Sequence, residues 1–183
     1  TTPEGLYRHY MTIAEQTRLP IIIYNVPSRT TLDISPDVLD RLADTGRFAG
    51  LKESSYNIPY VMEKAARLKG RITLYSGNDD TVLPLMAIGA RGVISVVANV
   101  LPEAMAEMAG SYLRGDAETA RGLQLKLLPL IRALFAEVNP IPCKAAAEMM
   151  GLCGGELRLP LVPIGEENRA KLRAALADAG VKL

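Results

Sequence analysis

The feature that most constrains the fold of this chain is a series of four short apolar runs separated by segments with helical punctuation. The runs do not alternate apolar with polar residues, which is typical of parallel strands covered on both faces. Between them, Ser35 and Pro36 mark the start of one helix and Gly46 marks its end. The pattern therefore predicts a β-α-β-α-β-α-β order, with strands at residues 21–24, 49–52, 72–75 and 92–97.

The spacing of these runs is compatible with two α/β architectures. The predicted strands end near Tyr24, Lys52, Ser76 and Ser95, and these intervals suit compact units of a (β/α)8 barrel. Doubly wound units suit them nearly as well. The chain has 183 residues, which is short of the roughly 250 typical of a closed barrel.

The pattern changes in the last third of the chain, where helices follow one another without strands. Residues 102–114 are predicted to form a helix of the barrel type, followed by helices at 116–137, 141–150 and 166–179. Pro129 is expected to bend the first of these three, because it removes a backbone donor in mid-helix. We therefore predict two domains, a barrel portion at residues 1–115 and a helical region at 116–183.

Composition narrows the class of protein. The chain carries 21 basic and 20 acidic side chains, and 49% of its residues are hydrophobic. Neither a basic surface for nucleic acid nor an apolar run long enough for a membrane is indicated. The first residues lack the basic-then-apolar pattern of a secretory signal, so a cytoplasmic location is expected.

Lys52 is the residue most indicative of chemistry. It ends the run FAGLK, where a parallel strand delivers its side chain to the edge at which such folds keep their active sites. A desolvated lysine is a nucleophile that can form a Schiff base with a carbonyl. The alternative is a structural lysine that forms an ion pair with Glu53 or another acid.

Tyr24 and Arg29 add to this interpretation. Tyr24 ends the preceding predicted strand, so its hydroxyl should lie beside Lys52, where it could pass protons during imine formation. Arg29 follows closely in the loop and presents a fork suited to a carboxylate. Taken alone, either could be structural: a packed tyrosine at the rim, or a solvated loop arginine.

The sequence resembles the dihydrodipicolinate synthase family of pyruvate-dependent aldolases, a superfamily that includes N-acetylneuraminate lyase. Two strings carry the resemblance, YNVPSRT at residues 24–30 and GLKESS at 50–55. It continues through LYSGNDD, ARGVISVVANVLP, NPIPCKAA and ELRLPLVPI, and so covers essentially the whole chain. The family implies a (β/α)8 TIM barrel, of which these residues would be strands five to eight followed by a C-terminal helical region.

The resemblance also implies roles for particular residues. Lys52 matches the imine-forming lysine, Tyr24 the central tyrosine of a proton relay, and Arg29 the arginine that receives the carboxylate of aspartate semialdehyde. Gly77 and Asn78 match a loop that borders the substrate, although the family often has an acid where Asn78 stands. Residue Ile94 matches a position whose backbone carbonyl faces the active site. Asn78 or Asp79 could instead simply cap the next helix.

The implied activity is the condensation of pyruvate with L-aspartate 4-semialdehyde to 4-hydroxy-tetrahydrodipicolinate, in lysine and diaminopimelate biosynthesis. It requires no cofactor and no metal. Two alternatives remain: another pyruvate-dependent Schiff-base aldolase, such as N-acetylneuraminate lyase or a keto-deoxy-sugar-acid aldolase, or an inactive fragment that acts only in assembly.

The family also implies parts that these residues do not include. Strands one to four would carry paired threonines that bind pyruvate and a second relay tyrosine contributed by an adjacent subunit. We therefore expect this chain to be a segment of a longer one, in a homotetramer built as a dimer of dimers.

Overall fold

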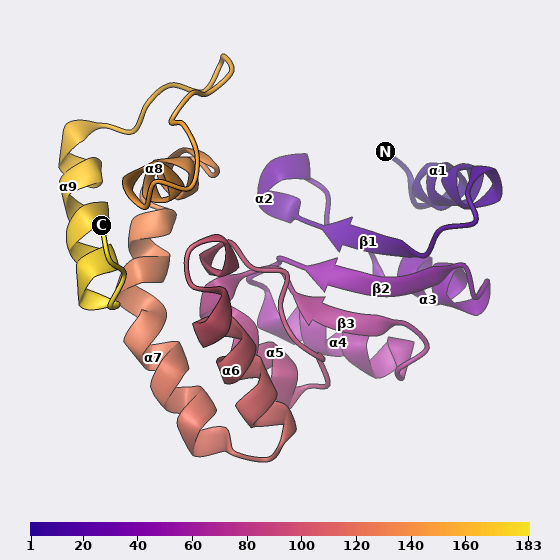
Figure 1. Cartoon of the computed structure of the whole chain (residues 1–183). Coiled ribbons are helices and arrows are strands. Elements are labelled where there is room, and N and C mark those ends of the chain that lie inside the picture. Colours follow the sequence, from indigo (N-terminus) through magenta and orange to yellow (C-terminus); the bar gives the residue numbers. More distant parts are fainter. The chain divides into compact units, whose positions relative to one another are not determined.

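The chain folds as two compact units, residues 1–94 and 95–183, and the computed structural model describes all 183 residues (Figure 1). The domain boundary expected after residue 115 concerns a barrel and its appended region, and it stays a prediction. In the structure, the helix at residues 102–113 belongs to the second unit, where it packs against the helix that follows it.

A three-stranded parallel sheet forms the centre of the first unit. Strand β1 spans Ile21–Asn25, β2 spans Phe48–Glu53 and β3 spans Thr73–Ser76, in the order β1-β2-β3. The three arrows run side by side in one direction in Figure 1. Three of the four predicted strands are therefore confirmed.

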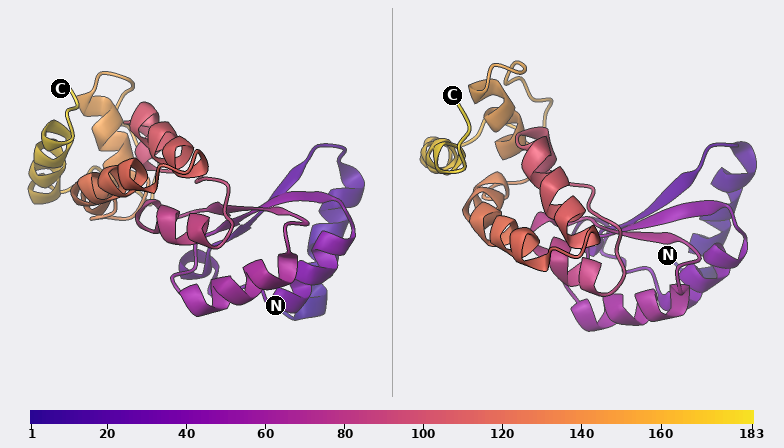
Figure 2. Two further views of the ribbon diagram at one scale, coloured as in Figure 1. Left: turned by 90° about the horizontal axis from the view of Figure 1, so that it is seen from below. Right: turned by 60° about the horizontal axis from the view of Figure 1, so that its bottom comes forward.

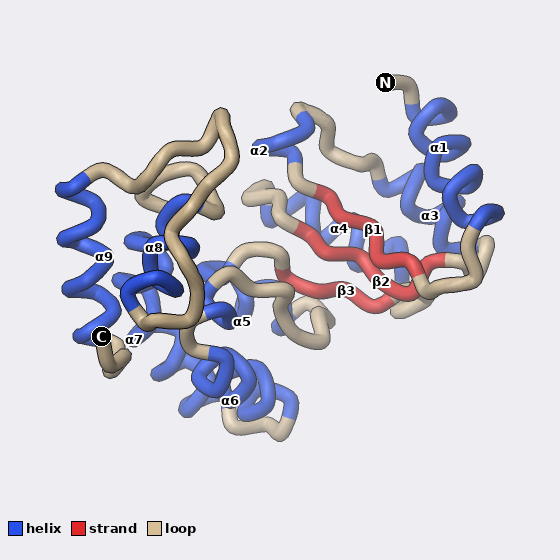
Figure 3. The backbone as a smooth tube through the Cα atoms, turned by 45° about the horizontal axis from the view of Figure 1, so that its top comes forward, coloured by secondary structure: helices blue, strands red, loops and turns tan.

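Helices alternate with these strands and lie on one side of the sheet. Figures 2 and 3 show α1, α3 and α4 on the same side, and α3 contacts both of the others. The sequence signals explain two of the helix starts: the Ser35 hydroxyl accepts from the backbone of Val38, and the Asn57 side chain accepts from that of Tyr60. The elements are α1 Pro3–Gln16, α2 Pro27–Thr30, α3 Pro36–Asp44, α4 Ile58–Leu68, the 3₁₀ turn η1 Asp79–Thr81 and α5 Val82–Ala87.

The two faces of the sheet have different environments. Ile23 and Leu51 are buried on the helix side, together with Leu39 of α3. On β1, Ile22 and Tyr24 point to the other face and remain 47% and 45% exposed. The strands therefore present a packed side and an open side, and the ends of the open side carry Tyr24 and Lys52.

The fourth predicted strand, at residues 92–97, is wrong as a regular strand. Only Val93 pairs with β3, through an isolated parallel bridge to Ser76. The chain then turns into a 3₁₀ helix, η2 (Val97–Asn99), because the Ser95 hydroxyl accepts a hydrogen bond from the Ala98 backbone at 2.9 Å. The apolar composition of residues 92–97 matches a strand pattern. The hydrogen bond to the Ser95 side chain instead favours a turn at this point of the chain.

Helices make up the second unit, as predicted. They are α6 Pro102–Leu113, α7 Ala117–Leu134, α8 Ile141–Met149 and α9 Glu166–Asp178. Helix α7 packs against α6, α8 and α9, and Leu130, Leu134, Leu172 and Leu176 are buried. Pro129 lies inside α7, which continues past it as one helix. None of the helices in either unit combines the length and apolarity needed to cross a membrane.

The helix-side core should dominate the stability of the first unit. Replacing Leu39, which is 0% exposed, by alanine should lower the free energy of unfolding by about 2–5 kcal/mol, because the substitution leaves a cavity. Urea unfolding followed by circular dichroism measures this loss. Leu19→Ala is the control, since Leu19 is 73% exposed and its loss should be near zero; equal losses for both variants would contradict the assigned core.

Candidate active site

Lys52 and Tyr24 lie next to each other at the carboxyl ends of two parallel strands. They are register partners across β1 and β2. The Lys52 ammonium nitrogen lies 4.2 Å from the centroid of the Tyr24 ring. The sequence predicted this proximity, and the register produces it: both residues precede the last residue of their strand, so both side chains point to the open face.

Lys52 forms no ion pair within this chain. The structural alternative for Lys52 was a pair with Glu53, but Glu53 lies on the opposite face of β2 and pairs with Lys64 at 3.0 Å. Lys52 is half-buried, and its ammonium group lies over the Tyr24 ring. The structural alternative, a lysine held by an ion pair with Glu53, is therefore wrong for Lys52.

Behind this pair, on the helix side of the sheet, lies a buried polar cluster made of Asn25, Asp33, Glu53 and Lys64. Asn25 donates to Glu53 at 2.7 Å and to Asp33 at 2.8 Å. Lys64, on α4, donates to both carboxylates. Glu53 is 0% exposed and Lys64 is 1% exposed, so opposite charges within hydrogen-bonding distance compensate the cost of burying them.

The buried polar cluster also holds the loop that follows β1. The side-chain oxygen Oδ1 of Asn25 accepts a hydrogen bond from the backbone N–H of Ile34 at 3.0 Å. The Ser55 hydroxyl donates to Asp33 at 3.1 Å, and the Ser55 backbone donates to Glu53 at 2.7 Å. The cluster therefore joins β1, β2, α4 and both ends of the loop that carries Arg29.

Tyr60 of α4 borders the cluster, with the Lys64 ammonium 4.8 Å from its ring centroid. Burial, and then the negative charge of Asp33, raises the pKa of the Tyr60 hydroxyl. Tyr60 is therefore protonated at neutral pH and offers an aromatic face to the lysine.

Gly77 and Asn78 connect β3 to the end of β2. The Gly77 backbone donates to the Glu53 carbonyl at 2.7 Å, and the Asn78 side chain donates to the Ser54 carbonyl at 3.2 Å. Asn78 stands at the start of η1 but makes no capping hydrogen bond with its side chain, so the alternative role as a helix cap is wrong for Asn78. Its amide instead attaches the loop to the segment after Lys52.

Close approach makes glycine necessary at residue 77. A Cβ atom there would lie 1.9 Å from the Ser54 hydroxyl oxygen and 3.1 Å from Cγ of Lys52. The Ser54 hydroxyl is buried and without a hydrogen-bond partner. Any side chain at residue 77 would therefore press on Ser54 and on the stem of Lys52.

Two further residues selected from the sequence, Arg29 and Ile94, follow the carboxyl ends of strands. Arg29 is an exposed residue of α2, the short helix that directly follows β1. Ile94 donates its backbone N–H to the Ser76 carbonyl at 2.9 Å, which places it beside the end of β3. His9, by contrast, is an exposed residue of α1 and stacks edge-on against Tyr10.

Tyr75 was not among the residues selected from the sequence. It is the register partner of Lys52 on β3, so Lys52 has a tyrosine opposite it on each neighbouring strand. Its ring lies over Gly50, where an added Cβ would come within 3.1 Å of it. Tyr75 lies one residue before the end of β3, as Tyr24 and Lys52 do in their own strands. This shared position in the sequence could have identified Tyr75 as a neighbour of Lys52.

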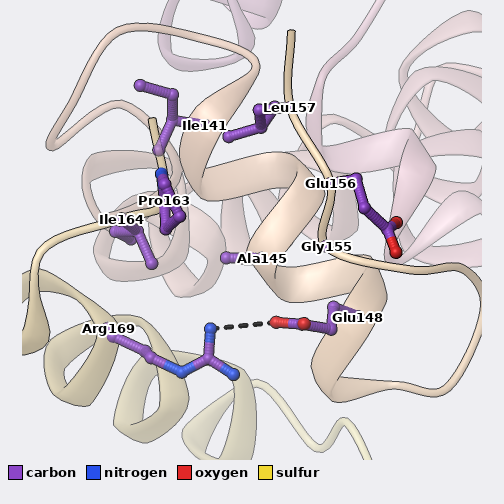
Figure 4. Close-up of a pocket in the computed structure, with 9 residues that line it drawn as sticks. All are labelled: Ile141, Ala145, Glu148, Gly155, Glu156, Leu157, Pro163, Ile164 and Arg169. Carbon is purple, nitrogen blue, oxygen red and sulfur yellow. Dashed lines mark hydrogen bonds and ion pairs between the residues drawn. The ribbon is translucent and has the colours of Figure 1, made fainter. Parts of the chain in front are cut away.

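A pocket in the second unit has a different character (Figure 4). It is a cavity of about 500 Å³ between α8, α9 and the segment that joins them, with Ile141 and Ile164 in its wall. Its central polar contact is an ion pair of Glu148 with Arg169 at 2.9 Å. The exposed Glu156 also lines the pocket, and none of the residues selected from the sequence does.

Comparison with known proteins agrees with this geometry. The dihydrodipicolinate synthetase family matches residues 1–179. The 4-hydroxy-tetrahydrodipicolinate synthase of Caldicellulosiruptor bescii is 48% identical over 183 residues, which are 100% of this chain and 62% of that protein. The corresponding synthase of Methanosarcina mazei is 47% identical over 182 residues, or 98% of this chain and 62% of the relative.

Solved structures show the same similarity. The dihydrodipicolinate synthase of Aquifex aeolicus superposes with a TM-score of 0.97 at 42% identity, covering 100% of this chain and 63% of that one. The chloride-inhibited synthase of Acinetobacter baumannii, complexed with pyruvate, gives a TM-score of 0.95 at 44% identity, covering 100% and 62%.

The sheet, the alternating helices and the lysine at a strand end define an α/β protein related to the TIM barrels. More particularly, the chain belongs to the dihydrodipicolinate synthetase family. It spans about 62% of the length of the curated relatives it matches.

The contact at Gly77 is testable by stability. Gly77→Ala should lower the free energy of unfolding by about 1–3 kcal/mol, because the added methyl group overpacks Ser54 and Lys52. Adding Ser54→Ala should recover part of this loss, as measured by urea denaturation.

The matched control is Gly122→Ala in α7, where an added Cβ meets nothing within 4 Å. That variant should gain about 0.5–1 kcal/mol from its higher helix propensity. A Gly77→Ala variant as stable as wild type would show that the turn after β3 tolerates a side chain.

Proposed function

We propose that the natural protein that contains this chain condenses pyruvate with L-aspartate 4-semialdehyde to 4-hydroxy-tetrahydrodipicolinate, a step toward diaminopimelate and lysine. The observation that carries the proposal is the Lys52 ammonium 4.2 Å from the Tyr24 ring centroid, at adjacent strand ends in a chain of this family. The names of the relatives point to the same reaction. No observation favours the neuraminate lyase, sugar-acid aldolase or assembly alternatives.

The proposed mechanism uses Lys52 as the nucleophile. Its neutral amine adds to the ketone carbon of pyruvate, and Tyr24 transfers a proton to the departing hydroxyl, which leaves as water. The resulting iminium withdraws electrons, so the pyruvate methyl group gives a proton back to the Tyr24 phenolate and an enamine forms. The enamine carbon then attacks the aldehyde carbon, and transimination or hydrolysis releases Lys52.

Arg29, Gly77, Asn78 and Ile94 complete the proposed substrate site. Arg29 receives the carboxylate of the semialdehyde, since a guanidinium binds a carboxylate through two parallel hydrogen bonds. Its place on α2, directly after the strand of Tyr24, supports this role. Gly77 and Asn78 border the substrate from the loop after β3, and the carbonyl of Ile94 faces it.

The proposed architecture explains the open face of the sheet. We assign β1, β2, β3 and the bridge at Val93 to strands five to eight of a (β/α)8 barrel. In a closed barrel the exposed side chains of Ile22 and Tyr24 would face the interior. We further propose a cytoplasmic homotetramer arranged as a dimer of dimers.

The imine can be tested directly by reducing it. Incubation of the natural protein with pyruvate and borohydride should attach a reduced pyruvyl group to Lys52, as read by mass spectrometry of its peptides. Lys52→Ala should give no adduct. Tyr24→Phe should form it about 10²–10⁴-fold more slowly, because the proton relay is lost.

Lys69→Ala is the control for Lys52→Ala, because Lys69 is an exposed lysine at the end of α4. The Lys69→Ala variant should form the reduced pyruvyl adduct on Lys52 as fast as the wild-type protein does. Folded wild-type protein without any adduct, or an adduct on another lysine, would overturn the proposed function.

Arg29 should govern the second substrate. Arg29→Ala should raise KM for aspartate semialdehyde about 10- to 100-fold, as expected for the loss of charged hydrogen bonds, and leave pyruvate trapping on Lys52 intact. Steady-state kinetics with each substrate varied in turn separates the two effects. An equal change in both KM values would remove Arg29 from this role.

A further inference from the structure

Every residue of the proposed reaction lies on the open face or in the loops, yet three charged or polar side chains, Asn25, Glu53 and Lys64, are buried behind it and contact the part-exposed Asp33. Tyr24 and Lys52 are followed in sequence by Asn25 and Glu53, which are register partners just as the first two are. Because successive side chains on a strand point to opposite faces, the hydrogen bond between Asn25 and Glu53 lies behind the contact of Tyr24 with Lys52.

This placement makes the two contacts mechanically dependent. The 2.7 Å bond from Asn25 to Glu53 joins the last residues of β1 and β2 on the helix side. A shift of one strand along the other would break that bond and would also separate Tyr24 from Lys52. The bond between the Ser54 backbone and the Asn25 carbonyl, at 2.9 Å, reinforces the same alignment.

Lys64 is the centre of the buried polar cluster. Its ammonium group donates to Glu53 at 3.0 Å and also to Asp33, so it holds the two carboxylates that accept from Asn25. Lys64 comes from α4, so it also fixes the strand ends to a helix that carries none of the proposed site residues.

Stability alone does not account for such a cluster. A buried ion pair is often no more stabilising than apolar side chains of the same volume, whereas its charged hydrogen bonds fix direction. Catalysis by the proposed nucleophile Lys52 depends on a fixed position and orientation of its side chain. A displacement of about 1 Å can lower the rate roughly 100-fold.

We propose that Lys64 is a positioning residue: through the buried polar cluster it holds the ends of β1 and β2 in the register at which Lys52 and Tyr24 react with pyruvate. The same cluster fixes the loop that carries Arg29, through Asn25 and Ile34. This inference rests on the proposed function and adds to it a residue that touches neither substrate nor reacting atoms.

The test measures pyruvate trapping and steady-state kinetics in the natural protein with two variants of the cluster. Lys64→Met removes the charge and keeps the length of the side chain. Asp33→Asn removes one carboxylate charge at a part-exposed position, 25% by side chain, and so disturbs the core less. Lys69→Met is the matched control, the same substitution at the exposed lysine that follows α4 as its C-cap.

Both cluster variants should still be trapped on Lys52, but with a rate and a kcat about 10- to 100-fold lower. Their KM for pyruvate should change little, because the cluster does not touch the substrate. Lys69→Met should match wild type. Circular dichroism and the melting temperature establish that each protein is folded at the assay temperature.

Two results would overturn the inference. A folded Lys64→Met variant with wild-type trapping rate and kcat, whatever its melting temperature, would show that the cluster only stabilises the fold. If Lys64→Met does not fold, a folded Asp33→Asn variant with wild-type trapping rate and kcat would overturn the inference in the same way. Failure of wild-type protein to form any adduct would instead overturn the proposed function itself, so the two failures are distinguishable.

Discussion

The hydrogen bond between Asn25 and Glu53 joins the ends of two parallel strands, and the geometry of the candidate site depends on it. At 2.7 Å and fully buried, it is protected from competition with water, so it is worth more than the same bond at the surface. The next residues back along each strand, Tyr24 and Lys52, inherit its alignment on the opposite face. A hydrogen bond on one side of the sheet thus sets the distance between Tyr24 and Lys52 on the other.

The two faces of the sheet divide the charged groups between them. On the helix side, Lys64 pairs with the carboxylates of Asp33 and Glu53, and neither of these carboxylates pairs with Lys52. On the open side, Lys52 is flanked across the sheet by Tyr24 and Tyr75 rather than by acids. The separation explains how two lysines only twelve residues apart can differ: Lys64 is an internal counterion, and Lys52 lies beside an aromatic ring on the open side.

The loops at the carboxyl ends of the strands are attached to the same framework. Asn25 holds the end of the loop that carries Arg29, and the backbone of Glu53 receives the N–H of Gly77. In the proposed barrel, parts that contact different substrates are thus connected through two adjacent strand ends. This connection fits the general position of active sites at the carboxyl edge of parallel sheets, where a rigid core presents variable loops.

The sequence by itself determined the main features of this protein. Apolar runs without alternation identified three parallel strands, helix boundary residues placed the helices between them, and the strings around Tyr24 and Lys52 identified the family. These features are local, because each depends on residues close together in the chain. The run at residues 92–97 showed the limit of such patterns: it has strand composition, but the Ser95 hydroxyl ends the pairing after one bridge.

Only the tertiary structure decided which charges meet. Lys64 was not among the residues selected from the sequence, and Glu53 was considered there as a possible ion-pair partner for the adjacent Lys52. The structure pairs Glu53 with Lys64 because the pleat of β2 sends Glu53 and Lys52 to opposite faces, while α4 packs its own lysine over the helix side. Partners eleven and thirty-one residues apart come together only when the helix docks on the sheet, so no local pattern contains them.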